Sequence, residues 1–139
     1  MKDRRIKIGI MPYKQFKKYT MAIACGKYKP KNGEPKIWFE SIETMSQVLS
    51  TKNMELLKLI KKEKPQSIKE LSNLSGRQTS NLSRTLKTFS KYGVVDFIKN
   101  KRMKIPVVKT TSFDIEYGNE YPYFLYDSDL QKELQTPGL

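Results

Sequence analysis

Two short amphipathic segments separated by a Ser-Gly pair constrain the fold of this chain most. The segment "SIKE" at residues 67–70 matches a capping box, in which the Ser67 hydroxyl accepts from the Glu70 amide and the Glu70 carboxylate accepts from the Ser67 amide. A helix is therefore expected to begin there and to end at Gly76 after about two turns. Its buried side is expected to comprise Ile68, Leu71 and Leu74.

The second segment is expected to be a helix that begins at Gln78 or Thr79 and continues to Lys91, with Gly93 as its C-cap. Its apolar side chains fall on one stripe, and hydroxyl and basic side chains project from the opposite side. Two helices joined by a glycine-containing turn, the second one exposing small hydroxyls and then long cations, are typical of a helix-turn-helix. The apolar stripe comprises Leu82, Leu86 and Phe89, and the outward side chains are Ser80, Ser83, Arg84, Lys87 and Lys91.

The charge of the chain favours a polyanionic partner. Its 139 residues include 27 Lys and Arg against 14 Asp and Glu, which gives a formal net charge of +13. Such an excess predicts attraction to nucleic acid or to an anionic membrane surface, and nucleic acid is the leading candidate. The excess lies in the body of the chain, because residues 113–139 hold 1 basic and 6 acidic residues.

The composition disfavours several classes of site. The sequence has no histidine, which is the commonest general base and metal ligand, and its single cysteine, Cys25, can form neither an internal disulfide nor a thiolate zinc site by itself. An enzyme, a metal site and a cofactor are therefore not expected. No run of about 18 apolar residues and no signal-peptide block is seen, so a cytoplasmic, nucleoid-associated protein without a membrane span is expected.

Residues 1–40 are expected to form a basic N-terminal extension of strand, helix and strand. Isoleucines alternate in "IKIGI" at residues 6–10, Pro12 suits the first turn of a helix, and a loop then leads to a short strand at residues 37–39. The buried side of this helix is expected to comprise Phe16, Thr20, Ile23 and Ala24. The first strand could instead pair with its copy in a second subunit.

The basic side chains of this extension have two interpretations. They either keep the protein soluble or extend a phosphate contact surface, and the first arginines could form a minor-groove arm. As a domain, the extension is expected to serve dimerisation or DNA backbone contacts. The candidate N-terminal DNA contacts are Arg4, Arg5, Lys14, Lys17 and Lys18.

Residues 41–112 are expected to form the main domain. Helical periodicity predicts two core helices before Pro65, and "VVDFIKNKRMKIPVVKTTSF" after Gly93 predicts an antiparallel hairpin with a basic tip. Pro106 indicates that the returning strand lies at an edge or follows a bulge. The order of helices, turn, helix and hairpin is that of a winged helix-turn-helix, an α+β fold. The cations at the tip are Lys99, Lys101, Arg102 and Lys104.

The stretch "SIKELSNLSGRQTSNLSRTLKTFSKYGVV" resembles the DNA-binding segment of MarR-like winged-helix regulators, and the likeness covers residues 67–109. The shared pattern is a leucine-rich support helix, a Ser-Gly turn, a Ser-Arg-x-Leu helix and a closing Gly-hydrophobic-Val. More widely, "FESIETMSQVLSTKN" joined to "SNLSRTLKTFSKYGVV" is similar to a family of short prokaryotic DNA-binding proteins, over about residues 4–110. The long terminal helices by which larger MarR regulators dimerise are missing.

This resemblance implies a sequence-specific regulator of double-stranded DNA. A homodimer on an inverted-repeat operator, repressing its own operon, is the expected form. The residues expected to read bases are Thr79, Ser80, Asn81, Ser83, Arg84 and Lys87. The residues expected to contact the DNA backbone are Ser67, Arg77, Gln78, Lys91, Lys99, Lys101, Arg102 and Lys104.

The C-terminal tail, residues 113–139, leaves alternatives open. It combines four tyrosines and two phenylalanines with its six acidic residues, whereas disordered tails are usually poor in aromatics. It is either inert, docked on the basic body, or a contact for a partner or second subunit. Because some similar proteins sit beside small toxin genes, the alternative function is an antitoxin that neutralises a protein toxin through this tail and represses the operon through the winged helix. A third interpretation is RNA binding.

Overall fold

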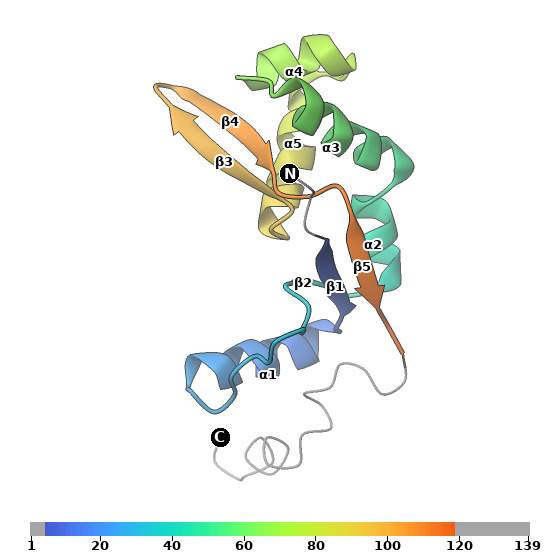
Figure 1. Ribbon diagram of the computed structural model, residues 1–139, viewed down its shortest axis with the longest axis vertical. Coiled ribbons are helices and arrows are strands. Elements are labelled where there is room, and N and C mark those ends of the chain that lie inside the picture. Colours follow the sequence, from blue (N-terminus) through green and yellow to red (C-terminus); the bar gives the residue numbers. More distant parts are fainter. Residues whose placement is uncertain (1–4, 119–139) are drawn as a thin grey trace. The chain divides into compact units, whose positions relative to one another are not determined.

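The computed structural model describes residues 5–118, and the chain divides into two compact units. We call the first the helical unit; it comprises Glu43–Phe113 together with Arg5. We call the second the sheet unit; of the described residues it comprises Ile6–Ile42 and Asp114–Gly118. Helices and small sheets occur together, so the expected α+β class is confirmed (Figure 1).

The helical unit contains four helices followed by a two-stranded hairpin. Its core is the apolar stripe predicted for the last helix, since Leu82, Leu86 and Phe89 are all fully buried, and Leu57 and Leu71 join them. The elements are α2 (Ile42–Val48), α3 (Thr51–Glu63), α4 (Ile68–Ser75), α5 (Thr79–Lys91), β3 (Val95–Asn100) and β4 (Met103–Val108).

The capping box before α4 forms in one of its two halves. The Glu70 amide donates to the Ser67 hydroxyl at 3.0 Å, as predicted. The Glu70 carboxylate instead accepts from the Gln66 amide at 3.1 Å, one residue earlier than expected. The helix ends as predicted at Gly76, whose φ of 73° lies in the left-handed region that glycine adopts without strain.

Two details of these helices differ from the sequence prediction. Leu74 was expected to be buried, but this residue is 43% exposed. It lies in the last turn of α4, whereas Leu71, one turn earlier, is the fully buried residue of this helix. The C-cap of α5 is Tyr92, and Gly93, with φ of 80°, follows it. The C-terminal turn is therefore closed by glycine just past the cap.

The hairpin is tight and regular. Asn100 pairs with Met103, so only Lys101 and Arg102 form its turn, and Lys101 adopts a φ of 58°. Because the sheet has two strands, β4 is an edge strand, which agrees with the expectation from Pro106. That proline is buried opposite Phe97.

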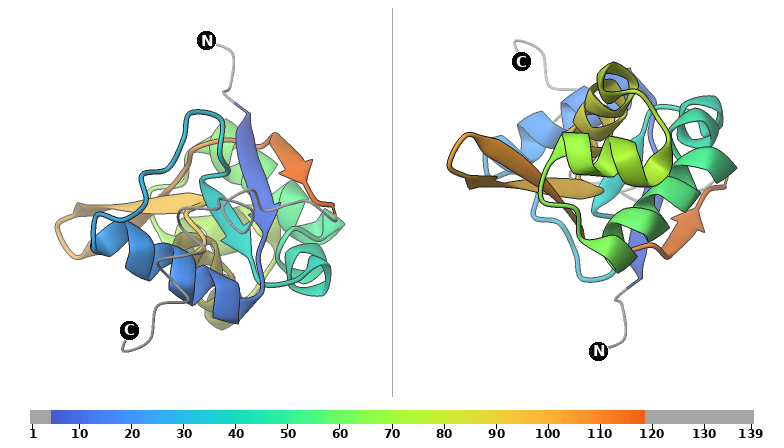
Figure 2. Two further views of the ribbon diagram at one scale, coloured as in Figure 1. Left: turned by 90° about the horizontal axis from the view of Figure 1, so that it is seen from below. Right: turned by 90° about the horizontal axis from the view of Figure 1, so that it is seen from above.

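The sheet unit is built around the first strand of the chain. Its elements are β1 (Ile6–Ile10), α1 (Tyr13–Ala24), β2 (Ile37–Phe39) and β5 (Phe113–Glu116). The strand order is β2-β1-β5, and β1 runs parallel to β2 (Figure 2). The expectation that β1 pairs with its copy in a second subunit is therefore wrong, because both of its edges are occupied within the chain. The start of the predicted tail is instead the third strand of this sheet.

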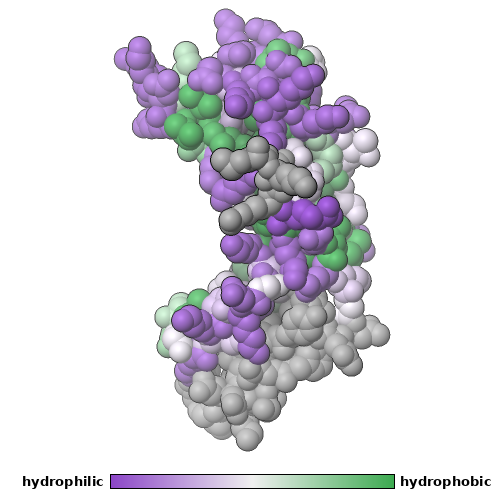
Figure 3. Space-filling view, in the orientation of Figure 1, coloured by the Kyte–Doolittle hydropathy of each residue, from purple (hydrophilic) through white to green (hydrophobic). Residues whose placement is uncertain are grey.

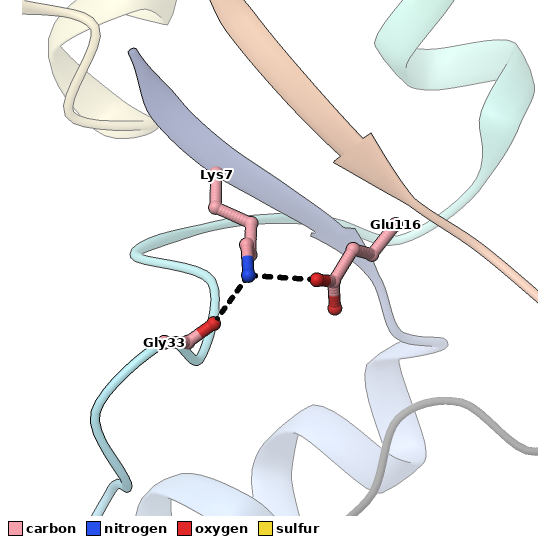
Figure 4. A network of polar contacts seen from close by, with 3 residues as sticks. All are labelled: Lys7, Gly33 and Glu116. Carbon is pink, nitrogen blue, oxygen red and sulfur yellow. Dashed lines mark hydrogen bonds and ion pairs between the residues drawn. The ribbon is translucent and has the colours of Figure 1, made fainter. Parts of the chain in front are cut away.

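Lys7 of β1 contacts both β5 and the loop that precedes β2. Its ammonium group donates to the carbonyl oxygen of Gly33 at 2.7 Å and lies 2.7 Å from the carboxylate of Glu116 (Figure 4). These contacts join β1 to β5 and to the loop before β2. The charges of Lys7 and Glu116 thus stabilise the sheet.

The buried face of α1 also differs from the prediction. Thr20 and Ala24 are exposed, whereas Tyr19 and Ala22 are buried in a cluster that includes Tyr28. The side chain of Glu34 accepts from the Tyr19 hydroxyl at 3.3 Å and from the Tyr28 hydroxyl at 2.7 Å. Burial raises the pKa of Tyr19 to about 12, and the negative charge of Glu34 acts in the same direction.

Candidate nucleic-acid interface

The outer face of α5 is polar and basic. All of its predicted outward side chains are exposed, and the sequence of this helix, "TSNLSRTLKTFSK", contains no acidic residue. The opposite stripe is buried in the core, so the orientation of the helix is fixed by packing. The exposed residues are Thr79, Ser80, Ser83, Arg84, Lys87 and Lys91.

The tip of the hairpin carries four cations in six residues. Lys99 and Lys104 are cross-strand partners, and Lys101 and Arg102 form the turn between them. All four are exposed. The Lys104 ammonium group lies 6.0 Å from the centre of the Phe97 ring, which holds it on one face of the hairpin. The structure thus brings the predicted wing cations together.

The opposite face of the hairpin is apolar. Ile98, Met103 and Val107 are 55%, 55% and 37% exposed. This face and the C-terminal end of α3 line a groove of about 360 Å³. Figure 3 shows the hydrophobic surface over the hairpin in green and the hydrophilic end of the hairpin in purple. The hairpin therefore has two chemically different sides.

Arg77 is turned toward the interior of the helical unit rather than outward. Its guanidinium nitrogens donate to Asn81 Oδ1 at 2.8 Å, to Asn53 Oδ1 at 3.2 Å and to Thr85 Oγ1 at 3.0 Å. Its carbonyl oxygen accepts from the Ser72 hydroxyl at 2.6 Å. These bonds favour a positioning role for Arg77 over the phosphate contact that the sequence suggests.

The other predicted residues of the turn region have mixed roles. The Ser67 hydroxyl is occupied as the cap of α4, whereas Gln78 is the exposed N-cap of α5 and makes no side-chain cap bond. Asn53 and Thr85, which hold Arg77, were missed by sequence reasoning. No local pattern pairs Asn53 with a residue 24 positions later.

The N-terminal cations lie mostly on the other unit. Lys14, Lys17 and Lys18 are exposed on α1 of the sheet unit, whereas α5 and the hairpin belong to the helical unit. Arg5 is exposed, and its guanidinium group approaches the carbonyl oxygen of Phe113 at 3.5 Å. Arg4 lies outside the described residues, as does the tail after Gly118.

Comparison with known proteins adds one similarity. Residues 48–115, slightly under half of the chain, match a family described as HVO_A0114, and this description names no activity. No curated protein and no solved structure matches the chain. Among residues 5–118, no helix is long and apolar enough to cross a membrane, and no three Cys, His, Asp or Glu side chains are grouped as a metal site would require.

Proposed function

We propose that this chain is a sequence-specific regulator that binds double-stranded DNA, with α4 and α5 as a helix-turn-helix and the β3–β4 hairpin as its wing. The observation that carries the proposal is the outer face of α5, which combines exposed hydroxyls with cations and has no acidic residue. A helix with such a face fits the major groove, where base edges and phosphates are both within reach.

The residue types on α5 match the chemistry of base reading. Arg84 can donate two parallel hydrogen bonds to guanine, and Ser80 and Ser83 can donate to or accept from base edges. Small side chains near the start of the helix also allow its backbone to approach the groove. Leu82 and Leu86 are fully buried on the other side, so the reading face is held on a rigid scaffold.

The hairpin tip supplies a sequence-independent part of the binding. Within residues 5–118 no acidic side chain pairs with these cations; the one acidic residue of the hairpin, Asp96, pairs with Lys109 at 3.3 Å at the far end of the strands. Phosphate groups of a duplex would screen the repulsion within this cluster and release counterions on binding. The wing is thus expected to contribute affinity rather than specificity.

The proposal is tested by a salt titration of binding to the duplex that precedes the protein's own gene, against a scrambled duplex of equal length. We expect the natural duplex to bind tighter by roughly a thousandfold, and both affinities to fall as salt rises. Equal affinity for both duplexes at every salt concentration would reject sequence-specific recognition. Duplex RNA and single-stranded RNA of the same sequence serve as controls for the RNA interpretation.

The number of chains on one duplex is a separate question. A single recognition helix contacts one half-site, so we propose that two copies bind an inverted repeat. Sedimentation of the protein with a duplex holding one or two half-sites measures this directly. A one-to-one complex on the full repeat would reject the dimer and leave the single-site proposal standing.

A further inference from the structure

A chain of hydrogen bonds with fixed direction runs through the helical unit and ends at Asn81. It begins at the end of α2, where the Val48 carbonyl oxygen accepts from Nδ2 of Asn53 at 3.0 Å. A carbonyl oxygen can only accept, so Asn53 must point its NH2 group there. Its Oδ1 atom is thereby left facing Arg77, from which it accepts at 3.2 Å.

Arg77 in turn fixes the orientation of an amide on α5, that of Asn81. A guanidinium group has donors only, so the end of Asn81 that faces Arg77 must be its oxygen, at 2.8 Å from Nε. Thr85 Oγ1 accepts from a third guanidinium nitrogen at 3.0 Å and holds the plane of the group against α5. The orientation of the Asn81 amide is therefore fixed, because the guanidinium group can only donate and the Val48 carbonyl oxygen can only accept.

The consequence is that Asn81 directs its NH2 group away from Arg77. Asn81 is exposed in the first turn of α5, and within residues 5–118 its Nδ2 atom makes no hydrogen bond. An asparagine that reads adenine in the usual way uses both ends of its amide, accepting from N6 and donating to N7. Here the oxygen faces Arg77 and already accepts one hydrogen bond from it, whereas both N–H donors remain available.

We propose that Asn81 recognises hydrogen-bond acceptors in the major groove through its amide donors alone, and that Arg77 is the positioning residue that enforces this. Purine N7, guanine O6 and thymine O4 are the acceptors of this kind. The inference rests on the proposed function, because it assigns a ligand chemistry to one residue of the same DNA-reading face. It replaces the phosphate contact expected of Arg77.

The first experiment uses the unaltered protein and chemically altered operator DNA. Binding of the unaltered protein and of Asn81→Ala is measured on operators that each carry one base-pair substitution. The base pair read by Asn81 is the one at which only the unaltered protein discriminates between bases. At that pair we expect removal of the acceptor, for example with 7-deazapurine, to weaken binding roughly threefold to tenfold, the worth of one hydrogen bond. Removal of the adenine N6 amino group is expected to have no effect. An equal loss from the N6 change would overturn donor-only reading.

The second experiment separates positioning from phosphate contact. In a double-mutant cycle, Arg77→Gln and Asn81→Ala should relax preference at the same base pair, and the double variant should lose no more than either one. The salt slope of Arg77→Gln should equal that of the unaltered protein, whereas loss of a phosphate contact would lower it by about one. A lower slope, or additive losses, would overturn the role given to Arg77.

Two controls keep the result interpretable. Asn73→Ala removes an exposed asparagine from α4 and should leave base preference unchanged. Thermal unfolding of Arg77→Gln shows whether the helical unit is intact, and the base-analogue experiment does not depend on that variant. If the unaltered protein shows no sequence preference at all, the proposed function fails. If preference exists but Asn81→Ala keeps it, or if removal of each groove acceptor of that base pair in turn (purine N7, guanine O6 or thymine O4) has no effect, only this inference fails.

Discussion

Lys99 of β3 and Lys104 of β4 stand directly opposite each other across the hairpin, on the same face as Phe97. Like charges at directly opposed positions of two strands destabilise a hairpin. Within residues 5–118, neither lysine forms an ion pair that would offset this repulsion. The arrangement therefore lowers the stability of the isolated hairpin and is suited to an anion that bridges both ammonium groups.

Replacement of Lys99, which faces Lys104 but makes no ring contact of its own in the described part of the chain, by Gln is expected to affect stability and DNA binding in opposite directions. Relief of the repulsion should stabilise the protein by about 0.2 to 1 kcal/mol. Loss of one phosphate contact should lower the salt slope of binding by about one. Urea denaturation and the salt titration measure the two effects; a variant that is less stable and binds equally well would contradict both expectations. Lys109→Gln, just past the other end of the hairpin, is the control: it removes a cation that pairs with Asp96, so no gain in stability is expected.

Arg84 and Arg102 are expected to make different contributions to binding. Arg84→Ala should weaken operator binding by on the order of 1 to 3 kcal/mol and have little effect on random DNA, because a bidentate pair with guanine is lost. Arg102→Ala should weaken both duplexes alike. Competition between operator and random duplexes measures the ratio of the two affinities. An unchanged ratio for Arg84→Ala would rule out its base-reading role.

Ser67→Ala should destabilise the helical unit by about 1 kcal/mol, since the Glu70 amide loses its acceptor at the start of α4. Ser80→Ala, on the exposed face of α5, is the matched control and should change the free energy of unfolding by less than about 0.5 kcal/mol. Chemical denaturation of both variants gives the comparison. Equal stabilities would show that the cap contributes nothing.

Tyr19 should make the stability of the protein depend on pH at the alkaline end. Its pKa is about 12 in the folded protein and 10.0 when unperturbed, so only the unfolded chain loses this proton between the two values. Below pH 10 the contribution is fully present; it falls as pH rises toward 12, by on the order of 2 kcal/mol in total.

The measurement for Tyr19 is a difference between two proteins, because the other tyrosines and the lysines titrate in the same range. Tyr19→Phe removes the titrating hydroxyl while keeping the ring that packs 5.5 Å from the Trp38 ring. We expect the stability gap between the unaltered protein and the variant to narrow from pH 9 to pH 12. A gap that stays constant over this range would contradict the raised pKa.

Local patterns in the sequence predicted the helical unit well. The spacing of Leu82, Leu86 and Phe89 defined the buried side of α5, since every partner in that pattern lies within a few residues of the next. The turn at Gly76 and the hairpin tip at Lys101 were also placed by short-range signals. Such features depend on backbone conformation that each segment determines for itself.

Features that depend on distant partners could not be predicted in the same way. Tyr19 is buried with its hydroxyl bonded to Glu34, 15 residues later, whereas periodicity alone favoured Thr20 at this face. The partner of such a hydroxyl is too distant in the sequence for a local pattern to reveal. In the sequence, Lys7 is an ordinary polar residue of an alternating strand; its ion pair with Glu116 depends on a residue at the other end of the described chain. The roles of base-reading candidates in α5 stay predictions, although their exposure agrees with that role.

The sheet order β2-β1-β5 has a consequence for the order in which the protein is assembled. Strands β1 and β2 are made early, but β5, the other neighbour of β1, follows the helical unit in the chain. A ribosome must therefore synthesise the whole helical unit, which ends at Phe113, before Glu116 allows the three-stranded sheet to close. We expect the helical unit to fold first, although the chain begins with a strand of the sheet.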